Sequence, residues 1–86
     1  MDMGQKEKLI KRLKGKPRDF TFDEAEALLR CFGYQRSDKG RTSGSRVMFY
    51  HDQYPPLLLH KPHPRKELLA YQVKQLIEAL EQEGLL

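Results

Sequence analysis

Three segments of the chain carry apolar residues at the spacing of a helix. They are residues 5–14, residues 22–32 and a last stretch that ends at Glu83. The first is short and rich in lysine, so we expect a helix that is marginal alone and docks on the rest of the protein. The second follows Thr21 and Glu24, which have the spacing of a capping box, and we expect it to end at Gly33. The start of the last helix lies between Lys66 and Ala70 in this pattern.

Between the second and third helical segments the pattern changes to alternation. Val47 and Phe49 alternate with Arg46, Met48 and Tyr50, which predicts a half-buried strand over residues 45–51. Residues 34–36 and 57–60 predict two shorter strands, because turn-forming residues bound both runs.

The order helix, helix, three strands, helix predicts the α+β class. We expect an α-β-β-β-α arrangement with a three-stranded antiparallel sheet, preceded by an extra short N-terminal helix. Both long helices should cover one face of the sheet, and the other face can stay open. Cys31, near the end of a core helix, is expected to be a small buried residue rather than a reactive thiol. The residues expected in the core are Leu28, Leu29, Val47, Phe49, Leu76, Ile77 and Leu80.

The composition is that of one small domain in a reducing compartment. The chain has 86 residues, and its single cysteine excludes both an intramolecular disulfide framework and a cysteine-rich zinc site. No apolar run approaches the roughly 18 residues of a membrane span. The first residues also lack the apolar centre of a secretion signal. We therefore expect a cytoplasmic protein that does not contact a membrane.

The positive charge is concentrated in three parts of the chain. Lys and Arg number 16 against 12 Asp and Glu, which gives a net charge of +4. The excess lies in residues 1–20, 36–46 and 61–66, and the sign reverses from Glu67 onward. An anionic partner, with nucleic acid first, is one interpretation. A solvated surface that keeps the protein soluble is the other, and charge alone does not decide between them.

Two groups of residues are candidates for chemistry. The loop SDKGRTSG, residues 37–44, contains Arg41 and precedes Arg46. Its backbone amides can hold a phosphate, although such a loop also serves as a plain hairpin connection. The histidines suit general acid–base work better than metal binding, and surface positions at strand ends are the alternative. We expect no metal and no other cofactor. The histidines are His51, His60 and His63, and the tyrosines that could stack on bases are Tyr34, Tyr50, Tyr54 and Tyr71.

Three features together resemble the HicA family of bacterial toxins. The first is EALLRCFGYQRSDKGRTSGSRVMF, similar to the family's helix, glycine-aromatic strand start, basic loop and Gly-Ser approach to the next strand. The second is KPHPRKEL, similar to the family's Pro-His-Pro with basic and acidic residues after it, and the third is a closing helix that ends in GLL. The resemblance covers roughly residues 22–86. We divide the chain into a basic extension with a short helix, residues 1–20, and a HicA-like domain, residues 21–86.

The resemblance implies a fold, an activity and a partner. The fold is that of the double-stranded-RNA-binding domain. The activity is cleavage of messenger RNA, which inhibits translation, and the partner is a neutralising HicB-type antitoxin. The family's catalytic residue is a histidine directly after the Gly-Ser pair, but here Gly44 and Ser45 are followed by Arg46.

Arg46 changes the chemistry that the resemblance implies. A guanidinium stays protonated and cannot act as the base for attack by a ribose 2′-OH. It can still stabilise the charge of a phosphoryl transition state. Three interpretations remain: the base has moved to a histidine, cleavage uses charge and positioning alone, or the protein binds RNA without cutting it. We expect Arg46 and His63 to be catalytic, because His63 matches the family's Pro-His-Pro position, with His60, at the end of a predicted strand, as the second histidine candidate.

The basic loops are the expected RNA-binding surface. His51 should be dispensable for catalysis, since about five residues at ~3.3 Å each separate it from Arg46 along one strand. The alternatives to a toxin are a non-catalytic RNA-binding module of the same fold and an interaction domain for an acidic protein. The residues expected to contact RNA are Lys39, Arg41, Ser43, Ser45, Lys61, Arg65 and Lys66.

Overall fold

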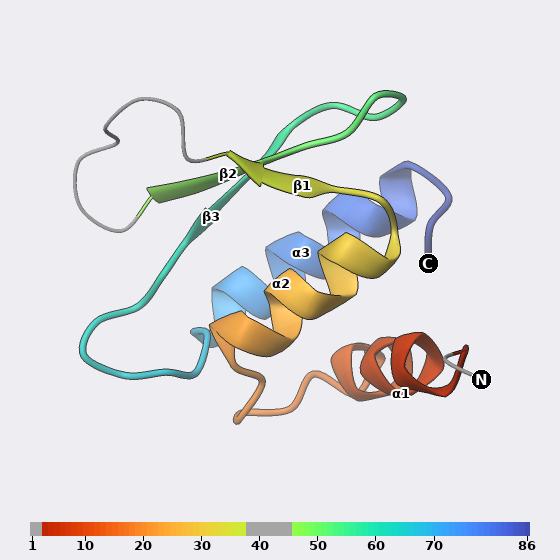
Figure 1. The fold of residues 1–86 in the computed structure, drawn as a ribbon. Helices are drawn as coiled ribbons and strands as arrows, with labels where there is room; N and C mark the ends of the chain where they lie inside the picture. The colour runs from red at the N-terminus through yellow and green to blue at the C-terminus, as the bar shows by residue number, and fades with distance from the viewer. Residues whose placement is uncertain (1–2, 38–45) are drawn as a thin grey trace.

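The structure is a computed structural model that describes residues 3–37 and 46–86. Its elements follow the order expected from the sequence and belong to the α+β class (Figure 1). The order of the elements is α1 (Met3–Lys14), α2 (Phe22–Cys31), β1 (Gln35–Ser37), β2 (Arg46–Tyr50), β3 (Leu57–His60) and α3 (Ala70–Gln82).

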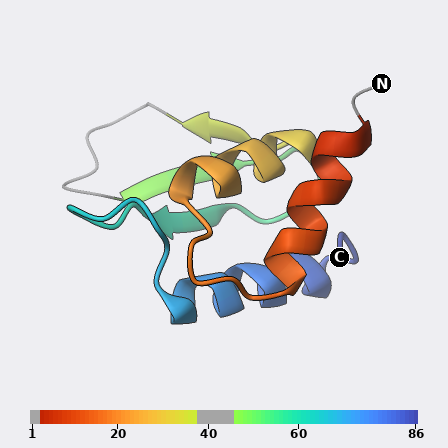
Figure 2. The same ribbon diagram turned by 90° about the horizontal axis from the view of Figure 1, so that it is seen from below.

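The three strands form one antiparallel sheet in the order β1-β2-β3. Helices α2 and α3 lie side by side and cover one face of this sheet, as expected (Figures 1 and 2). Helix α1 lies on the side of the helix layer away from the sheet. On β2, Val47 and Phe49 are buried, whereas Arg46 and Tyr50 are exposed on the opposite face. One sheet face is therefore open, which confirms the alternation in the sequence.

The core lies between the sheet and the helix layer and extends under α1. All seven residues expected in the core are buried. Leu9 and Leu13 of α1 are buried with them, so the first helix docks on the domain as expected. The expectation for Cys31 is wrong, because its side chain is exposed. Cys31 follows the buried Leu29 by two positions, about 200° around the helix axis, which directs it away from the core.

Local signals set both ends of α2. The hydroxyl of Thr21 accepts a hydrogen bond from the backbone N–H of Glu24 at 3.1 Å, and the Glu24 carboxylate accepts one from the N–H of Thr21 at 2.9 Å. This is the expected capping box. Gly33 ends the helix with a left-handed φ of 100°. The N–H of Tyr34 donates to the carbonyl of Leu29 at the helix end, so β1 begins one residue later than expected.

Helix α3 begins at Ala70 without a side-chain hydroxyl or carboxylate at its cap. Instead, Gln72 Oε1 accepts a hydrogen bond from the N–H of Leu69 at 2.8 Å. In the described ranges, no helix is long and apolar enough to cross a membrane.

Candidate functional site

Arg46 and His60 lie directly opposite each other at one end of the sheet. They are cross-strand partners in the antiparallel pair of β2 with β3, and both are exposed. The next pair, Val47 with Leu59, is buried, so Arg46 and His60 both belong to the open face. Cβ atoms of directly opposed residues are about 4.5–5.5 Å apart. A guanidinium and an imidazole can therefore reach the same phosphate.

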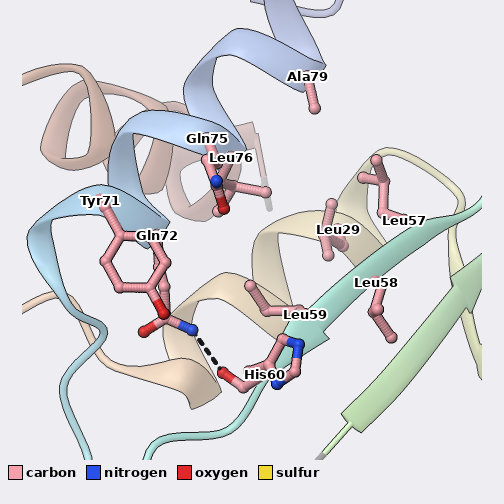
Figure 3. Close-up of a pocket in the computed structure, with 10 residues that line it drawn as sticks. All are labelled: Leu29, Leu57, Leu58, Leu59, His60, Tyr71, Gln72, Gln75, Leu76 and Ala79. Carbon is pink, nitrogen blue, oxygen red and sulfur yellow. Dashed lines mark hydrogen bonds between the residues drawn. The ribbon is translucent and has the colours of Figure 1, made fainter.

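The position of His60 is fixed from the helix layer. Its backbone carbonyl accepts a hydrogen bond from Nε2 of Gln72 at 2.8 Å (Figure 3). Gln72 is only 5% exposed, and its Oε1 is used at the start of α3. The side-chain amide of Gln72 thus joins the end of β3 to the start of α3. The sequence contained a signal for this residue, because Gln72 interrupts an apolar series with Leu76 and Leu80 at four-residue spacing.

A hollow of about 190 Å³ opens beside His60, between β3 and α3 (Figure 3). Five of the ten residues that line it are leucines, and Tyr71 at its edge is 58% exposed. An exposed aromatic ring in the same hollow as His60 is suited to stacking on a nucleobase. The residues around the hollow are Leu29, Leu57, Leu58, Leu59, His60, Tyr71, Gln72, Gln75, Leu76 and Ala79.

Of the tyrosines suggested for stacking, two are well exposed. Tyr71 borders the hollow, and Tyr50 on the open sheet face is 49% exposed. Tyr34, in contrast, is buried in the core. Its ring meets the ring of His51 edge-on, with centroids 5.0 Å apart. Tyr34 therefore has a packing role.

His51 is held in a structural network at the opposite end of β2 from Arg46. Its Nε2 lies 3.0 Å from the carbonyl oxygen of Phe32, and its Nδ1 accepts a hydrogen bond from the N–H of Gln53 at 2.9 Å. Because Nδ1 accepts, Nε2 carries the hydrogen and donates to the carbonyl. His51 also packs so closely on Gly33 that a Cβ there would lie 2.9 Å from Nε2. These contacts explain the glycine at this helix end.

Two of the expected RNA-binding lysines lie near the start of α2. The ammonium of Lys61 is 5.7 Å from the centre of the Phe22 ring, a cation–π distance. The backbone carbonyl of Lys66 accepts a hydrogen bond from the N–H of Phe22 at 3.0 Å, and the Lys66 residue is exposed. Lys61 directly follows His60, so a cation continues the basic end of the sheet.

The remaining expected site residues lie elsewhere. His63 is exposed in the segment between β3 and α3, three positions beyond His60, and its bond to Pro64 is cis. Arg65 donates from Nε to the carbonyl of Glu67 at 3.1 Å and borders a second groove, on the helix side. Lys39, Arg41, Ser43 and Ser45 lie outside the described residues. Within residues 3–37 and 46–86, no group of three or more His, Cys, Asp or Glu side chains is arranged to hold a metal ion.

These elements define a small α+β protein with an open sheet face and a basic sheet end. The family model for the HicA toxin of bacterial toxin-antitoxin systems matches residues 22–85, and the chain belongs to this family. Membership implies a toxin function and an antitoxin partner. Neither the curated proteins nor the solved structures gave a match. Helix α1 lies before the matched region.

Proposed function

We propose that this toxin binds messenger RNA at the Arg46 end of the sheet and cleaves it, until a HicB-type antitoxin neutralises it. The observation that carries the proposal is the register of β2 and β3, which pairs an exposed arginine with an exposed histidine. Both residues lie in the part of the chain that matches the toxin family. Lys61 directly follows His60, Lys66 is an exposed cation in the segment before α3, and Tyr71 offers an exposed ring for stacking beside the hollow at His60.

The proposed reaction is attack of a ribose 2′-OH on the adjacent phosphate. The 2′ oxygen forms a bond to phosphorus, and the bond from phosphorus to the 5′ oxygen breaks. A base accepts the proton of the 2′-OH, and an acid supplies a proton to the leaving oxygen. Arg46 is assigned to the negative charge of the transition state, because a guanidinium stays protonated.

The proton transfers are assigned to two histidines. His60 is the base candidate that shares the sheet end with Arg46. His63 is the acid candidate, at the position that resembles the family's Pro-His-Pro. Histidine is suited to both roles, since its side chain exchanges protons near neutral pH. A reaction with one base and one acid should show a bell-shaped dependence of rate on pH.

RNA degradation by purified protein across a pH series tests this assignment. Arg46→Ala should lower the cleavage rate about 10²-fold or more, with only a modest loss of RNA binding. His60→Ala and His63→Ala should each remove one limb of the pH profile. Arg46→His, which restores the residue that the family resemblance implies, should raise cleavage and toxicity. Lys8→Ala, an exposed cation on α1, is the control and should leave cleavage unchanged.

A non-catalytic RNA-binding module is the second candidate. The specific observation in its favour is Arg46 itself, which stands where the resemblance implies a catalytic histidine. If no variant cuts RNA, including Arg46→His, this second function is the better account. If Arg46→Ala, His60→Ala and His63→Ala all cut at the unaltered rate, the catalytic site is elsewhere.

A further inference from the structure

A groove of about 600 Å³ lies on the helix side of the molecule. One wall is the linker between α1 and α2, and the other is the start of α3 with the segment just before it. This groove shares no lining residue with the hollow beside His60. Its lining consists of Lys16, Pro17, Arg18, Arg65, Leu68, Leu69, Ala70, Val73 and Lys74.

The groove combines an apolar floor with a basic rim. The floor is formed by proline, leucine, alanine and valine side chains. The four charged residues of the lining, Lys16, Arg18, Arg65 and Lys74, are all cationic. Only Arg65 has an acidic neighbour among the ion pairs of the described residues, with Glu67 Oε1 at 4.0 Å from its Nε. A ligand that fits this lining must carry both negative charge and apolar surface.

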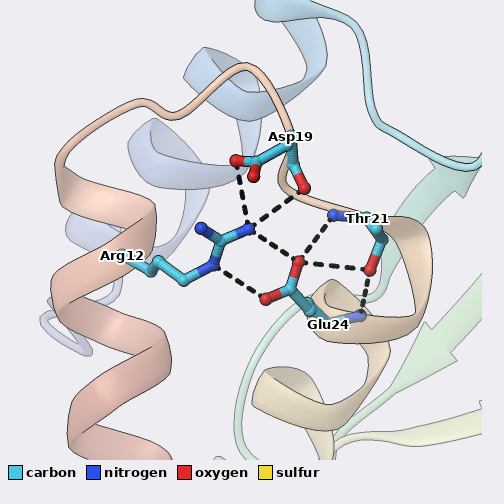
Figure 4. Close-up of polar contacts among 4 residues, drawn as sticks. All are labelled: Arg12, Asp19, Thr21 and Glu24. Carbon is cyan, nitrogen blue, oxygen red and sulfur yellow. Dashed lines mark hydrogen bonds and ion pairs between the residues drawn. The ribbon is translucent and has the colours of Figure 1, made fainter.

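The linker wall is held in place by α1. Arg12 of α1 donates two hydrogen bonds to the Glu24 carboxylate, from Nε at 2.8 Å and from Nη2 at 3.0 Å (Figure 4). The same Nη2 donates to the backbone carbonyl of Asp19 at 3.0 Å and lies 3.2 Å from its Oδ1. Leu13 and Phe20, on either side of the linker, are fully buried. The cations of the linker therefore project from a fixed backbone.

Lys16 adds a strained conformation to this wall. Among the residues that the structure describes, Lys16 is the one non-glycine residue with a left-handed backbone, and its φ is 52°. That conformation is unfavourable for any residue with a Cβ atom. Strained residues persist where the surrounding structure holds them, and they cluster at binding sites. At this position a glycine would relieve the strain but would remove the cation from the rim.

We propose that this groove is a docking site for an acidic segment of the antitoxin that also presents an apolar side chain. Aspartate and glutamate of the segment would face the rim, and the apolar side chain would lie on the floor. The proposal rests on the antitoxin partner of the proposed function. Residues 16–18 lie outside the matched range 22–85, so three of the nine lining residues come from the extension of this chain. The extension would therefore help to select the partner.

The lining fits a peptide better than it fits RNA. RNA offers phosphates to cations and flat bases to aromatic rings. No lining residue of the groove is aromatic, so bases would have no ring on which to stack. The apolar floor would also be left without a partner under a phosphate backbone. An acidic peptide with a leucine or phenylalanine uses both parts of the lining.

Titration calorimetry with the full-length cognate antitoxin tests the proposal. Ala70→Phe fills the floor from an exposed position without any change of charge, and Lys74→Glu reverses one charge of the rim. Each should raise the Kd for the antitoxin about tenfold or more. Lys8→Glu makes the same charge change on an exposed part of α1 and should stay within about twofold of the unaltered chain. Binding of a short poly(U) RNA should be unchanged by Ala70→Phe.

A further variant separates binding from folding. Lys16→Gly should keep or raise the Tm, because it relieves the left-handed backbone, and should still weaken antitoxin binding. If the unaltered toxin does not bind the antitoxin at all, the partner in the proposed function is wrong. If the antitoxin binds all groove variants as tightly as the unaltered toxin, the groove proposal alone is overturned. It is also overturned if these variants weaken only RNA binding, which would make the groove an RNA site.

Discussion

At the scale of single residues, the hydroxyl of Tyr34 is the most unusual buried group. Tyr34 is 2% exposed, and its hydroxyl has no hydrogen-bond partner among the described residues. Burial raises the pKa of this phenol, and the nearby Glu83 and Tyr54 raise it further. The folded protein therefore favours the neutral phenol. The contribution of the neutral Tyr34 phenol to the free energy of unfolding is present below about pH 10. It is lost as the pH rises through the raised pKa.

We expect Tyr34→Phe to leave the free energy of unfolding unchanged or to raise it by up to about 1 kcal/mol. The substitution removes a buried polar group that makes no hydrogen bond and keeps the ring that packs on His51. Urea unfolding at pH 7 measures the change. Tyr71→Phe, at an exposed hydroxyl, is the control and should have no effect on stability. A loss of more than about 1 kcal/mol for Tyr34→Phe would show that the hydroxyl has a partner in solution.

The sequence predicted the conformation and contacts of individual residues where the signal comes from neighbouring positions. The capping box of Thr21 and Glu24 and the left-handed Gly33 involve only neighbouring positions, and all three are confirmed. The prediction that Cys31 is buried was wrong, because its exposure depends on which side of α2 packs against the rest of the protein. The bridge from Gln72 to the His60 carbonyl joins residues 12 positions apart, and such a contact appears only after the elements pack.

At the scale of elements, the ion pair between Arg12 and Glu24 ties α1 to α2. The hydrogen bond from Arg12 is the main cause that lowers the pKa of Glu24, and the backbone N–H of Thr21 lowers it further. Desolvation acts in the opposite direction but does not outweigh these contacts. A lowered carboxyl pKa means that the folded protein favours the carboxylate. Its stability contribution is present above about pH 4.5 and is lost as the pH falls through the lowered pKa.

We expect Glu24→Gln to destabilise the protein by roughly 1 kcal/mol at neutral pH, because the charge-assisted contact with Arg12 is lost. The difference from the unaltered chain should shrink as the pH falls below about 4.5 and through the lowered pKa of Glu24. Thermal unfolding over a pH series measures this. Glu78→Gln on the exposed side of α3 should not change that pH dependence. A constant difference at all pH values would contradict a role for the Glu24 charge.

The order of the elements was predictable, but the pairing at the site was not. Helical and strand periodicities gave the α+β class and the seven core positions, since each pattern repeats within its own segment. The opposition of Arg46 and His60 depends on the register of two strands joined by residues 51–56. A one-residue shift would move each side chain to the other face, and no sequence signal in that connection specifies the register.

At the scale of the whole molecule, cations gather in two separate places. One is the end of the sheet with Arg46 and Lys61, and the other is the groove on the helix side with Arg18 and Lys74. The sequence predicted the first, because its basic loops are continuous segments. It did not predict the second, whose cations come from the linker, from Arg65 and from α3. The two regions have different surroundings, so they should respond differently to salt and to substitution.

Salt dependence of RNA binding distinguishes the two basic regions. Each phosphate that a cation neutralises releases condensed counterions. The logarithm of the affinity for single-stranded RNA therefore falls with the logarithm of the salt concentration, with a slope of about 0.7 for each contact. Arg46→Ala and Lys61→Ala should each lower the slope of log K against log salt by roughly that amount. Lys74→Ala removes one charge as well, but from the groove, and should leave the slope unchanged. The measurement is fluorescence anisotropy of a labelled poly(U) RNA over a salt series. An affinity that does not change with salt would exclude a phosphate-binding role for the sheet end. A reduced slope for Lys74→Ala would instead assign the groove to RNA.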